Sequence, residues 1–392
     1  MALQDAVRFF VSEAHSLACL SVVCGTREKT CRAMGGVINA EGDAVREDSI
    51  FDLASITKLF TGMSVLKLWE SGRLDLDLPV TRYAPQFVHL TKTRVDELLG
   101  FETGLRTDQR VDTCLSREKG LEELFSIRPV PNAGQRAYSD MHAMVLKYIV
   151  EGASGKSYLE YLHSEILDPL GMESTFGLVP ESLRERCVSC DREHRIEKER
   201  WIVRDGVKPG TPHDPKARLL NTPEDCCGHA GLFATIGDLE IFCRGVLEGR
   251  ILSDGTLRYM ARNRTGHPVE GGGYTQYLGC QCYVRHPEQV HSEVPVYMSD
   301  RSIAISGFTG HHLSVDPERG IFMIALGNRV LNRLSVLVPE EGKTRKDYGL
   351  NPDGTGCMRW TDGESIWSSV DYVHLKDAHL HWPAAEALGL DV

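Results

Sequence analysis

The distribution of apolar residues predicts a chain with strands near both ends and helices in the middle. Residues 3–16 carry apolar side chains at helical spacing, which predicts an amphipathic helix. The next two β-like runs, Leu17–Cys24 and Thr30–Ile38, are separated by a short polar turn and predict a hairpin. Further strand-like runs lie toward the other end, at Gln276–Val284, His311–Asp316 and Ile321–Leu326.

Helical spacing dominates between these regions, most clearly in Ala143–Glu151, Tyr158–Leu167 and Asp238–Leu247. We therefore expect a mixed α/β fold in which one sheet is built from distant segments of the chain. Residues 187–228 lack a clear period and are predicted to be loops. The expected units are residues 1–75 with 240–335, which hold the sheet, a mainly helical insertion at 76–239, and a C-terminal extension at 336–392.

The C-terminal extension is the part with the weakest pattern. Leu350–Gly356 has the composition of a turn, and Ser365–Leu375 fits either a strand or a helix. Three histidines, His374, His379 and His381, are expected to lie on a solvated element rather than to bind a metal ion. We assign this segment no function from its sequence.

Charge and hydropathy exclude several classes of protein. The 392 residues include 44 basic and 55 acidic side chains, a net charge of −11, which argues against nucleic acid or an anionic membrane surface as the main partner. No window of about 20 residues is apolar throughout, so we expect no membrane span. Asp5 and Glu13 interrupt the N-terminal apolar residues, so we expect no secretory signal and a cytoplasmic protein.

Twelve cysteines are scattered along the chain and are expected to be reduced thiols, most of them buried. Cys187 and Cys190, followed by His194, have the spacing of a metal site. A second ligand pair is missing, and charged residues surround the three side chains. We therefore expect a polar surface loop here and predict neither a metal ion nor a cofactor.

Serine three residues before lysine occurs at Ser55, Ser64 and Ser116, and the context separates the three. Ser55 begins a strongly apolar helical pattern that ends at Gly72, whereas Ser64 falls in mid-helix and Ser116 in a charged stretch. On a helix, residues three apart share one face, so the amine of Lys58 can reach the Ser55 hydroxyl. Burial would favour a neutral Lys58 that accepts the serine proton. A helix-capping serine beside a solvated lysine is the structural alternative.

The segment from Phe51 to Lys58, FDLASITK, resembles the nucleophile motif of the class C β-lactamases and their relatives. Those penicillin-binding-protein-like relatives include serine esterases, D-aminopeptidases and DD-carboxypeptidases. Further matches follow in the family's order at Leu98–Leu105, His213–Pro215 and Gly228–Thr235, so the resemblance covers roughly residues 15–330. It implies a β-lactamase/transpeptidase-like fold, an antiparallel sheet flanked by helices with an inserted helical region.

The resemblance also implies a second motif, Tyr-x-Asn, which reads Tyr138-Ser139-Asp140 in this chain. Tyr138 would share a proton with Lys58 and pass it to the leaving group, since a nearby ammonium lowers the pKa of a phenol. Asp140 replaces the usual asparagine, and as a carboxylate it would pair with Lys58 and make a neutral lysine less available. The alternative for Tyr138 is a core tyrosine that caps the following helix.

The third motif of the family is a basic residue followed by Thr-Gly, and this chain has Ile305-Ser306-Gly307 in its place. The resemblance implies that Gly307 lets substrate approach the strand and that the Phe308 N–H joins that of Ser55 in an oxyanion hole. The cation that would bind a substrate carboxylate is absent. His311 and His312 follow on a strand, so at most one of them points inward.

Together these motifs predict a serine hydrolase that forms an acyl-enzyme on a small ester or amide. A β-lactamase, a D-Ala-D-Ala carboxypeptidase or a D-aminopeptidase is the alternative within the same class, made less favourable by Ile305. A non-catalytic binding or scaffold protein is the alternative outside it. Three departures from the family pattern, at Phe101, Asp140 and Ile305, speak for that reading. The oligomeric state does not follow from the sequence.

Overall fold

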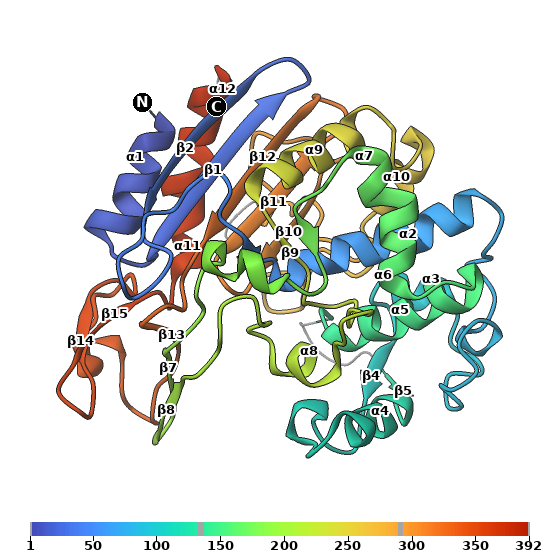
Figure 1. Ribbon diagram of the computed structural model, residues 1–392, viewed down its shortest axis with the longest axis horizontal. Helices are drawn as coiled ribbons and strands as arrows, with labels where there is room; N and C mark the ends of the chain where they lie inside the picture. Colours follow the sequence, from blue (N-terminus) through green and yellow to red (C-terminus); the bar gives the residue numbers. More distant parts are fainter. Residues whose placement is uncertain (1, 132–136, 289–292, 391–392) are drawn as a thin grey trace.

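A five-stranded antiparallel sheet organises the computed structural model, which describes residues 2–131, 137–288 and 293–390 (Figure 1). Its strand order is β10-β11-β12-β1-β2, so the last strands of the sheet pair directly with the first. This confirms the mixed α/β fold with a sheet built from both ends. The strands are β1 (Cys19–Thr26), β2 (Thr30–Gly36), β10 (Ile303–Gly307), β11 (His311–Asp316) and β12 (Ile321–Gly327).

Both faces of this sheet are covered by helices, and alternate residues of β1 contribute to the two faces. Val22 packs in a cluster with α1 (Ala2–Arg8) and α12 (Trp382–Leu388), whereas Val23 packs in the main core. The two terminal helices lie side by side on the outer face (Figure 1). On the inner face, α9 (Ile236–Leu247) packs against β1, β11 and β12.

The helical region next to the inner face surrounds α2 (Thr57–Glu70), which is buried along most of its length. The predicted helices at 143–151 and 238–247 lie within α5 and α9, and the one at 158–167 is α6 continued by a π-turn. The other helices here are α3 (Val95–Leu99), α4 (Arg117–Phe125), α5 (Asp140–Ser154), α6 (Tyr158–Leu162), α7 (Asp168–Leu170) and α10 (Asp254–Met260). Short strands complete it: β3 (Phe51–Asp52), β6 (Thr175–Phe176) and β9 (Phe233–Ala234) in one sheet, β4 (Gly104–Arg106) and β5 (Arg128–Val130) in another.

A second five-stranded sheet, of order β14-β15-β13-β7-β8, shows that residues 187–228 are not simply loops. The hairpin of β7 (Glu193–Glu197) and β8 (Arg200–Arg204) lies in this stretch, as does α8 (Pro215–Leu220). The β7–β8 hairpin is a local pairing that the sequence analysis missed, whereas the parallel pairing of β7 with β13 (Arg333–Val338) has no local signal. Part of the C-terminal extension supplies β14 (Cys357–Arg359), β15 (Ser365–Ser368) and α11 (Tyr372–Lys376), so its ambiguous segment is both strand and helix.

The predicted strand at Gln276–Val284 is wrong. The segment forms turns that make only isolated bridges, between Leu278 and Tyr283 and between Tyr283 and Ala304. Gln281 has a φ of 56°, which breaks an extended conformation, and its side chain donates to the Leu98 and Leu99 carbonyls. Alternating hydrophobicity here reflects burial of a turn rather than a strand.

Two predictions about surface elements are also wrong. Cys187, Cys190 and His194 are buried rather than on a polar loop, and the His194 ring packs edge-on against Trp360. His381 is buried in the outer-face cluster, because α12 docks there. His379 stacks on Phe9 with ring centroids 3.5 Å apart.

All twelve cysteines are free thiols and nine of them are buried, as the sequence predicts. Within the described residues, no helix combines the length and apolar character needed to cross a membrane. The division of the chain into three units stays a prediction.

Candidate active site

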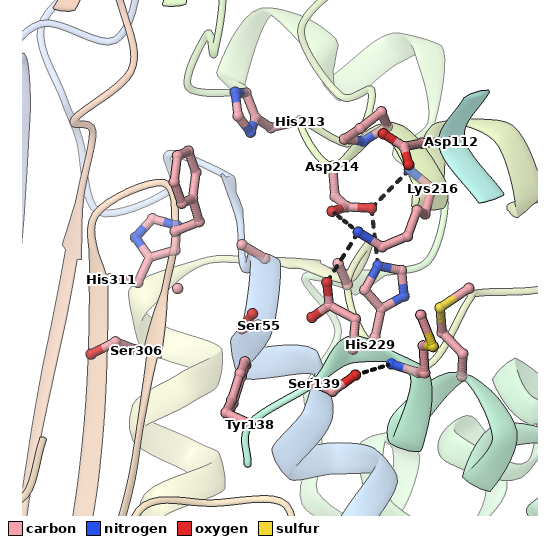
Figure 2. A pocket seen from close by; sticks show the side chains of 18 of the residues that line it. Ser55, Asp112, Tyr138, Ser139, His213, Asp214, Lys216, His229, Ser306 and His311 are labelled. Carbon is pink, nitrogen blue, oxygen red and sulfur yellow. Dashed lines mark hydrogen bonds and ion pairs between the residues drawn. The ribbon is translucent and has the colours of Figure 1, made fainter. Parts of the chain in front are cut away.

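Ser55 lies at the floor of a cavity, in a one-turn 3-10 helix (Ala54–Ile56) between β3 and α2 (Figure 2). Ala54 has a left-handed φ of 45°, which makes the chain turn sharply just before the serine. Asp52 holds this turn, since its carboxylate accepts hydrogen bonds from the backbone N–H of Ala54 (2.9 Å) and of His213 (2.6 Å). The turn leaves Ser55 half-buried while its neighbours pack in the core.

Lys58 is completely buried beneath Ser55, so the alternative of a solvated lysine is wrong. Its ammonium donates to Ser55 Oγ (2.9 Å) and to the His229 carbonyl (3.0 Å), and it forms an ion pair with Asp140 (2.7 Å). Burial alone would lower the pKa of Lys58, but the Asp140 carboxylate and the Tyr138 phenol together outweigh it and raise the pKa above its usual value. The resting site therefore holds a charged Lys58, contrary to the prediction from burial.

Tyr138 lies on the other wall of the cavity and packs against two aromatic rings. Phe101 and Tyr283 stack on it, with centroids 5.5 and 5.6 Å away. Lys58 Nζ lies 5.0 Å from the Tyr138 ring centroid. Burial raises the pKa of the Tyr138 phenol despite the nearby Lys58, so the phenol keeps its proton at neutral pH. Phe101, a departure from the family pattern, thus fixes the orientation of Tyr138.

Tyr138 does not cap the helix that follows, which removes the alternative role for it. The Ser139 hydroxyl accepts a hydrogen bond from the Met141 N–H (3.3 Å) and is the N-cap of α5. Asp140 is the first residue of that helix, and its side chain faces Lys58. The capped helix start therefore places a phenol and a carboxylate on opposite sides of the same short segment.

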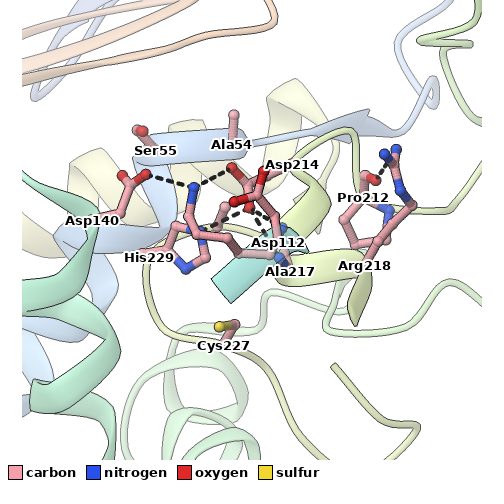
Figure 3. A network of polar contacts seen from close by, with 12 residues as sticks. Ala54, Ser55, Asp112, Asp140, Pro212, Asp214, Ala217, Arg218, Cys227 and His229 are labelled. Atoms are coloured by element: carbon pink, nitrogen blue, oxygen red, sulfur yellow. Dashed lines mark hydrogen bonds and ion pairs between the residues drawn. The ribbon is translucent and has the colours of Figure 1, made fainter. Parts of the chain in front are cut away.

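A chain of ion pairs extends from Asp140, the partner of Lys58, to Asp214 and His229 (Figure 3). The second oxygen of Asp140 binds Lys216 Nζ at 3.0 Å, and Lys216 also binds Asp214 at 3.1 Å. Asp214 accepts in turn from His229 Nε2 at 2.9 Å. Burial alone would raise the pKa of Asp140, but the surrounding cations, Lys58 first, hold it below its usual range. Asp140 is therefore an ionised carboxylate between two lysines.

The same network contains the one group of side chains in the described residues whose geometry fits a metal ion, Asp140, Asp214 and His229. The ammonium of Lys216 already bridges the two carboxylates. A protein cation thus occupies the position that a metal ion would need, so these residues are a poor fit to a metal site.

The strand β10 borders the cavity opposite α5, but only part of the predicted third motif reaches it. Ile305 is completely buried in the main core, whereas Ser306, Gly307 and Phe308 line the cavity. A Cβ atom on Gly307 would lie 2.8 Å from the Leu53 carbonyl oxygen, so glycine lets β10 pack against the turn that precedes Ser55. Gly307 therefore brings Phe308 close to Ser55.

Ser306 is held by a buried ion pair from the C-terminal segment. Lys376 of α11 donates to Ser306 Oγ (2.7 Å) and pairs with Glu293 (2.6 Å). The Ser306 hydroxyl donates to the same carboxylate. Lys376 is neutralised by Glu293 and does not line the cavity. Lys376 therefore does not replace the missing cation of the third motif.

One histidine of β11 points inward, as predicted. His311 lines the cavity and its Nε2 lies 2.6 Å from the Asp52 carbonyl oxygen, whereas His312 faces Ser314 and His381. Burial lowers the pKa of His311 to about 4, so the ring is neutral. His311 thus stabilises the turn that precedes Ser55 and supplies no charge to the cavity.

Comparisons with known proteins agree with this geometry. A model of the β-lactamase family, described as "Beta-lactamase", matches residues 10–336. The chain belongs to the β-lactamase family. A Salmonella agona protein named as a candidate D-alanyl-D-alanine carboxypeptidase is 24% identical over 324 residues, which cover 75% of this chain and 73% of that protein.

Solved structures share the fold at lower identity. EstCE1, a hydrolase with promiscuous acyltransferase activity, superposes with a TM-score of 0.65 at 18% identity over 83% of this chain and 92% of its own. A class C β-lactamase from Rhodobacter sphaeroides gives a TM-score of 0.61 at 18% identity over 84% and 94%. The fold is thus that of a family of serine hydrolases, and the residues matched by the family end before most of the C-terminal extension.

Sequence reasoning placed Ser55, Lys58, Tyr138 and Asp140 in one site, and the structure brings these four together. It missed Lys216, Asp214 and His229. Asp214 and His229 lie in segments, His213–Pro215 and Gly228–Thr235, that resemble family segments without a role of their own, and Lys216 lies in neither. The charged network of this β-lactamase family member is visible only in three dimensions.

Replacement of Asp140 by asparagine is expected to shift the pH dependence of hydrolysis toward lower pH. If Lys58 is the base, activity rises with pH as its ammonium loses a proton. The carboxylate raises the pKa of Lys58, so its removal leaves burial to lower that pKa. The measurement is kcat/KM for an ester against pH, with Asp112→Asn as a control that removes a carboxylate paired with Arg110 instead. An unmoved rising limb in Asp140→Asn would contradict the role of Lys58.

Proposed function

We propose that this protein is a serine hydrolase that forms an acyl-enzyme on Ser55 and acts on a small ester or amide. One observation carries the proposal: the Ser55 hydroxyl and the buried Lys58 amine are 2.9 Å apart at the floor of a cavity of about 680 Å³. Membership of the β-lactamase family supports the same reading.

The reaction needs one proton to move from Ser55 to the leaving group. Ser55 Oγ bonds the carbonyl carbon, and its proton goes to Lys58 Nζ in molecules in which that amine is neutral. The Tyr138 phenol gives its proton to the leaving oxygen or nitrogen as that bond breaks, and Lys58 returns a proton to Tyr138. The backbone N–H groups of Ser55 and Phe308 stabilise the oxyanion, and water then releases the acid by the reverse route.

The proposed substrate is an ester or simple amide rather than a β-lactam or a D-Ala-D-Ala peptide. Those ligands carry a carboxylate beside the scissile amide, which a basic residue of the third motif would bind. Ile305 is buried in the core at that position, and Lys376 is paired with Glu293. The D-alanyl-D-alanine carboxypeptidase activity in the name of the Salmonella protein is therefore not the one we assign here.

Covalent labelling tests this proposal directly. The protein is treated with a fluorophosphonate probe, its intact mass is measured, and the adduct is mapped by peptide analysis. We expect one adduct on the peptide that holds Ser55 and none in Ser55→Ala. Ser116→Ala is the matched control, because Ser116 also precedes a lysine by three residues but caps α4. An adduct that persists in Ser55→Ala would overturn the assignment.

A further inference from the structure

The cavity has an arginine-rich wall that the proposed catalytic steps do not use. Arg195 of β7, Arg204 of β8 and Arg329 after β12 line it together with Phe308. Alternation along β7 points Arg195 toward the cavity, while its neighbour Ile196 packs in the core of the second sheet. The second sheet thus contributes two guanidinium groups to the cavity that contains Ser55. We name Arg195, Arg204 and Arg329 the arginine wall.

Arg329 is the member of the wall with unused binding capacity. It is only 7% exposed, and Nη2 donates to the Ser335 carbonyl. Its Nε is buried without a hydrogen-bond partner. The Arg329 side chain forms no ion pair with a carboxylate in the part of the chain that the structure describes. Burial lowers its pKa to about 10, so the guanidinium remains charged at neutral pH. A buried charge with a vacant donor is costly unless a ligand completes it.

The carboxylates near the wall do not balance its charge. Arg195 pairs with Glu193 (3.1 Å) and Glu197 (3.1 Å). Arg204 shares Glu193 at 3.6 Å. His213 also bonds Glu193, at 2.9 Å. Glu197 is also bound by Arg200 at 2.8 Å, so neither carboxylate is free for Arg329. Arg329 feels the charges of Glu193 and Asp371 but forms an ion pair with neither, and its guanidinium is left to bind an anion.

The aromatic ring of Phe308 links this charge to the reaction centre. The guanidinium carbons of Arg329 and Arg195 lie 5.1 and 5.9 Å from its centroid, and His213 stacks on it at 5.5 Å. In Figure 2, Ser55 lies between Tyr138 and His213. Because Tyr138 would protonate the leaving group, the leaving group faces Tyr138, and the acyl group extends the other way, toward Phe308 and the arginine wall.

We infer that the acyl group transferred to Ser55 ends in a carboxylate, which the arginine wall binds. The substrates are then half-esters or half-amides of short dicarboxylic acids, and hydrolysis releases a dicarboxylate and a neutral alcohol or amine. The inference rests on the proposed function and names its substrate class. It assigns Arg329 the main contact, since its side chain lines the cavity and forms no ion pair with a carboxylate in the described residues. Charge-assisted bonds of this kind add selectivity as well as affinity.

A matched pair of esters tests the inference. The p-nitrophenyl half-ester of glutaric acid and p-nitrophenyl valerate have acyl chains of the same length and differ in the terminal carboxylate. We expect kcat/KM to be at least about tenfold higher for the anionic ester. The preference should shrink with rising salt, because the attraction is electrostatic. Equal values for the two esters, or a preference for valerate, would overturn the inference.

Two variants assign the preference to the wall. Arg329→Gln should lower the ratio of the two kcat/KM values at least about tenfold. Arg204→Gln should lower this ratio as well. Because Arg204 is more exposed than Arg329, this variant can replace Arg329→Gln if the latter does not fold. Arg333→Gln is the control, since Arg333 donates to the His15 carbonyl outside the cavity. If both variants fold, an unchanged ratio of the two kcat/KM values in both would overturn the assignment. If Arg329→Gln does not fold, an unchanged ratio in Arg204→Gln would overturn it.

A third ester separates the two sides of the cavity. In 4-carboxyphenyl acetate the carboxylate is on the leaving group, and we expect no preference for it over phenyl acetate. A preference that Arg204→Gln removes would overturn the orientation. Failure of the proposed function looks different: neither ester of the matched pair is hydrolysed and Ser55 takes up no probe. Hydrolysis of both esters without discrimination leaves the proposed function intact and removes this inference alone.

Discussion

Replacement of Ser55 by alanine is expected to lower kcat for p-nitrophenyl acetate by at least about 10³-fold. Removal of a catalytic nucleophile has effects of this order or larger, because the remaining groups only bind and polarise the substrate. The change is small in structural terms, since Ser55 is half-buried and its turn is held by Asp52 and not by its own hydroxyl. Initial rates for purified protein measure the effect.

A thermal unfolding curve must accompany that measurement. An unchanged Tm for Ser55→Ala would assign the loss of rate to chemistry rather than to unfolding. Ser64→Ala is an unsuitable control, because the Ser64 hydroxyl is buried and donates to the Phe60 carbonyl (2.8 Å). Ser116→Ala is the better one. A rate that falls less than tenfold in folded Ser55→Ala would contradict the nucleophile assignment.

Tyr138→Phe is expected to lower kcat by about 10²–10⁴-fold, the usual contribution of a positioned general acid or base. The phenyl ring should keep its place, because Phe101 and Tyr283 both stack on it. The loss is then one of proton transfer and not of packing. Rates for a series of aryl and alkyl acetates measure it.

The leaving group gives this experiment a second readout. A nitrophenolate leaves without a proton, whereas an alkoxide does not, so the loss should be larger for the alkyl ester. Tyr148→Phe is the control, since Tyr148 packs on Phe87 and Phe125 away from the cavity. Equal losses for all leaving groups would contradict the role of Tyr138 as the acid that protonates the leaving group.

Local patterns predicted the element that carries Ser55 and Lys58, two of the proposed catalytic side chains. Ser55 and Lys58 are three residues apart on one helical stretch, so a local period decides that they meet. The hairpin of β1 and β2 is likewise a short-range pattern, with antiparallel strands joined by a turn. The family resemblance added Tyr138 and Asp140, which no period in the sequence connects to Ser55.

The remaining parts of the site depend on contacts between distant segments, which local patterns do not predict. β7 and β13 are about 140 residues apart, and their parallel register gives no local signal, so Arg195 was assigned to a loop. Burial alone gave the wrong charge state for Lys58, whereas the pairing with Asp140 that the sequence led us to expect is present. Arg329 reaches the cavity only because Gly310 and Gly327 let their strands end close together.

The order in which the sheet is assembled has a consequence for synthesis of the chain. β1 is made about 300 residues before its neighbour β12. At ribosomal rates of roughly 5–20 residues per second, one edge of an apolar strand stays unpaired for roughly 15–60 s. Tyr372, which also lines the cavity and donates to the Gly310 carbonyl (2.9 Å), is made later still. The unpaired edge is open to aggregation during that interval, and the cavity is complete only after Tyr372 has been made.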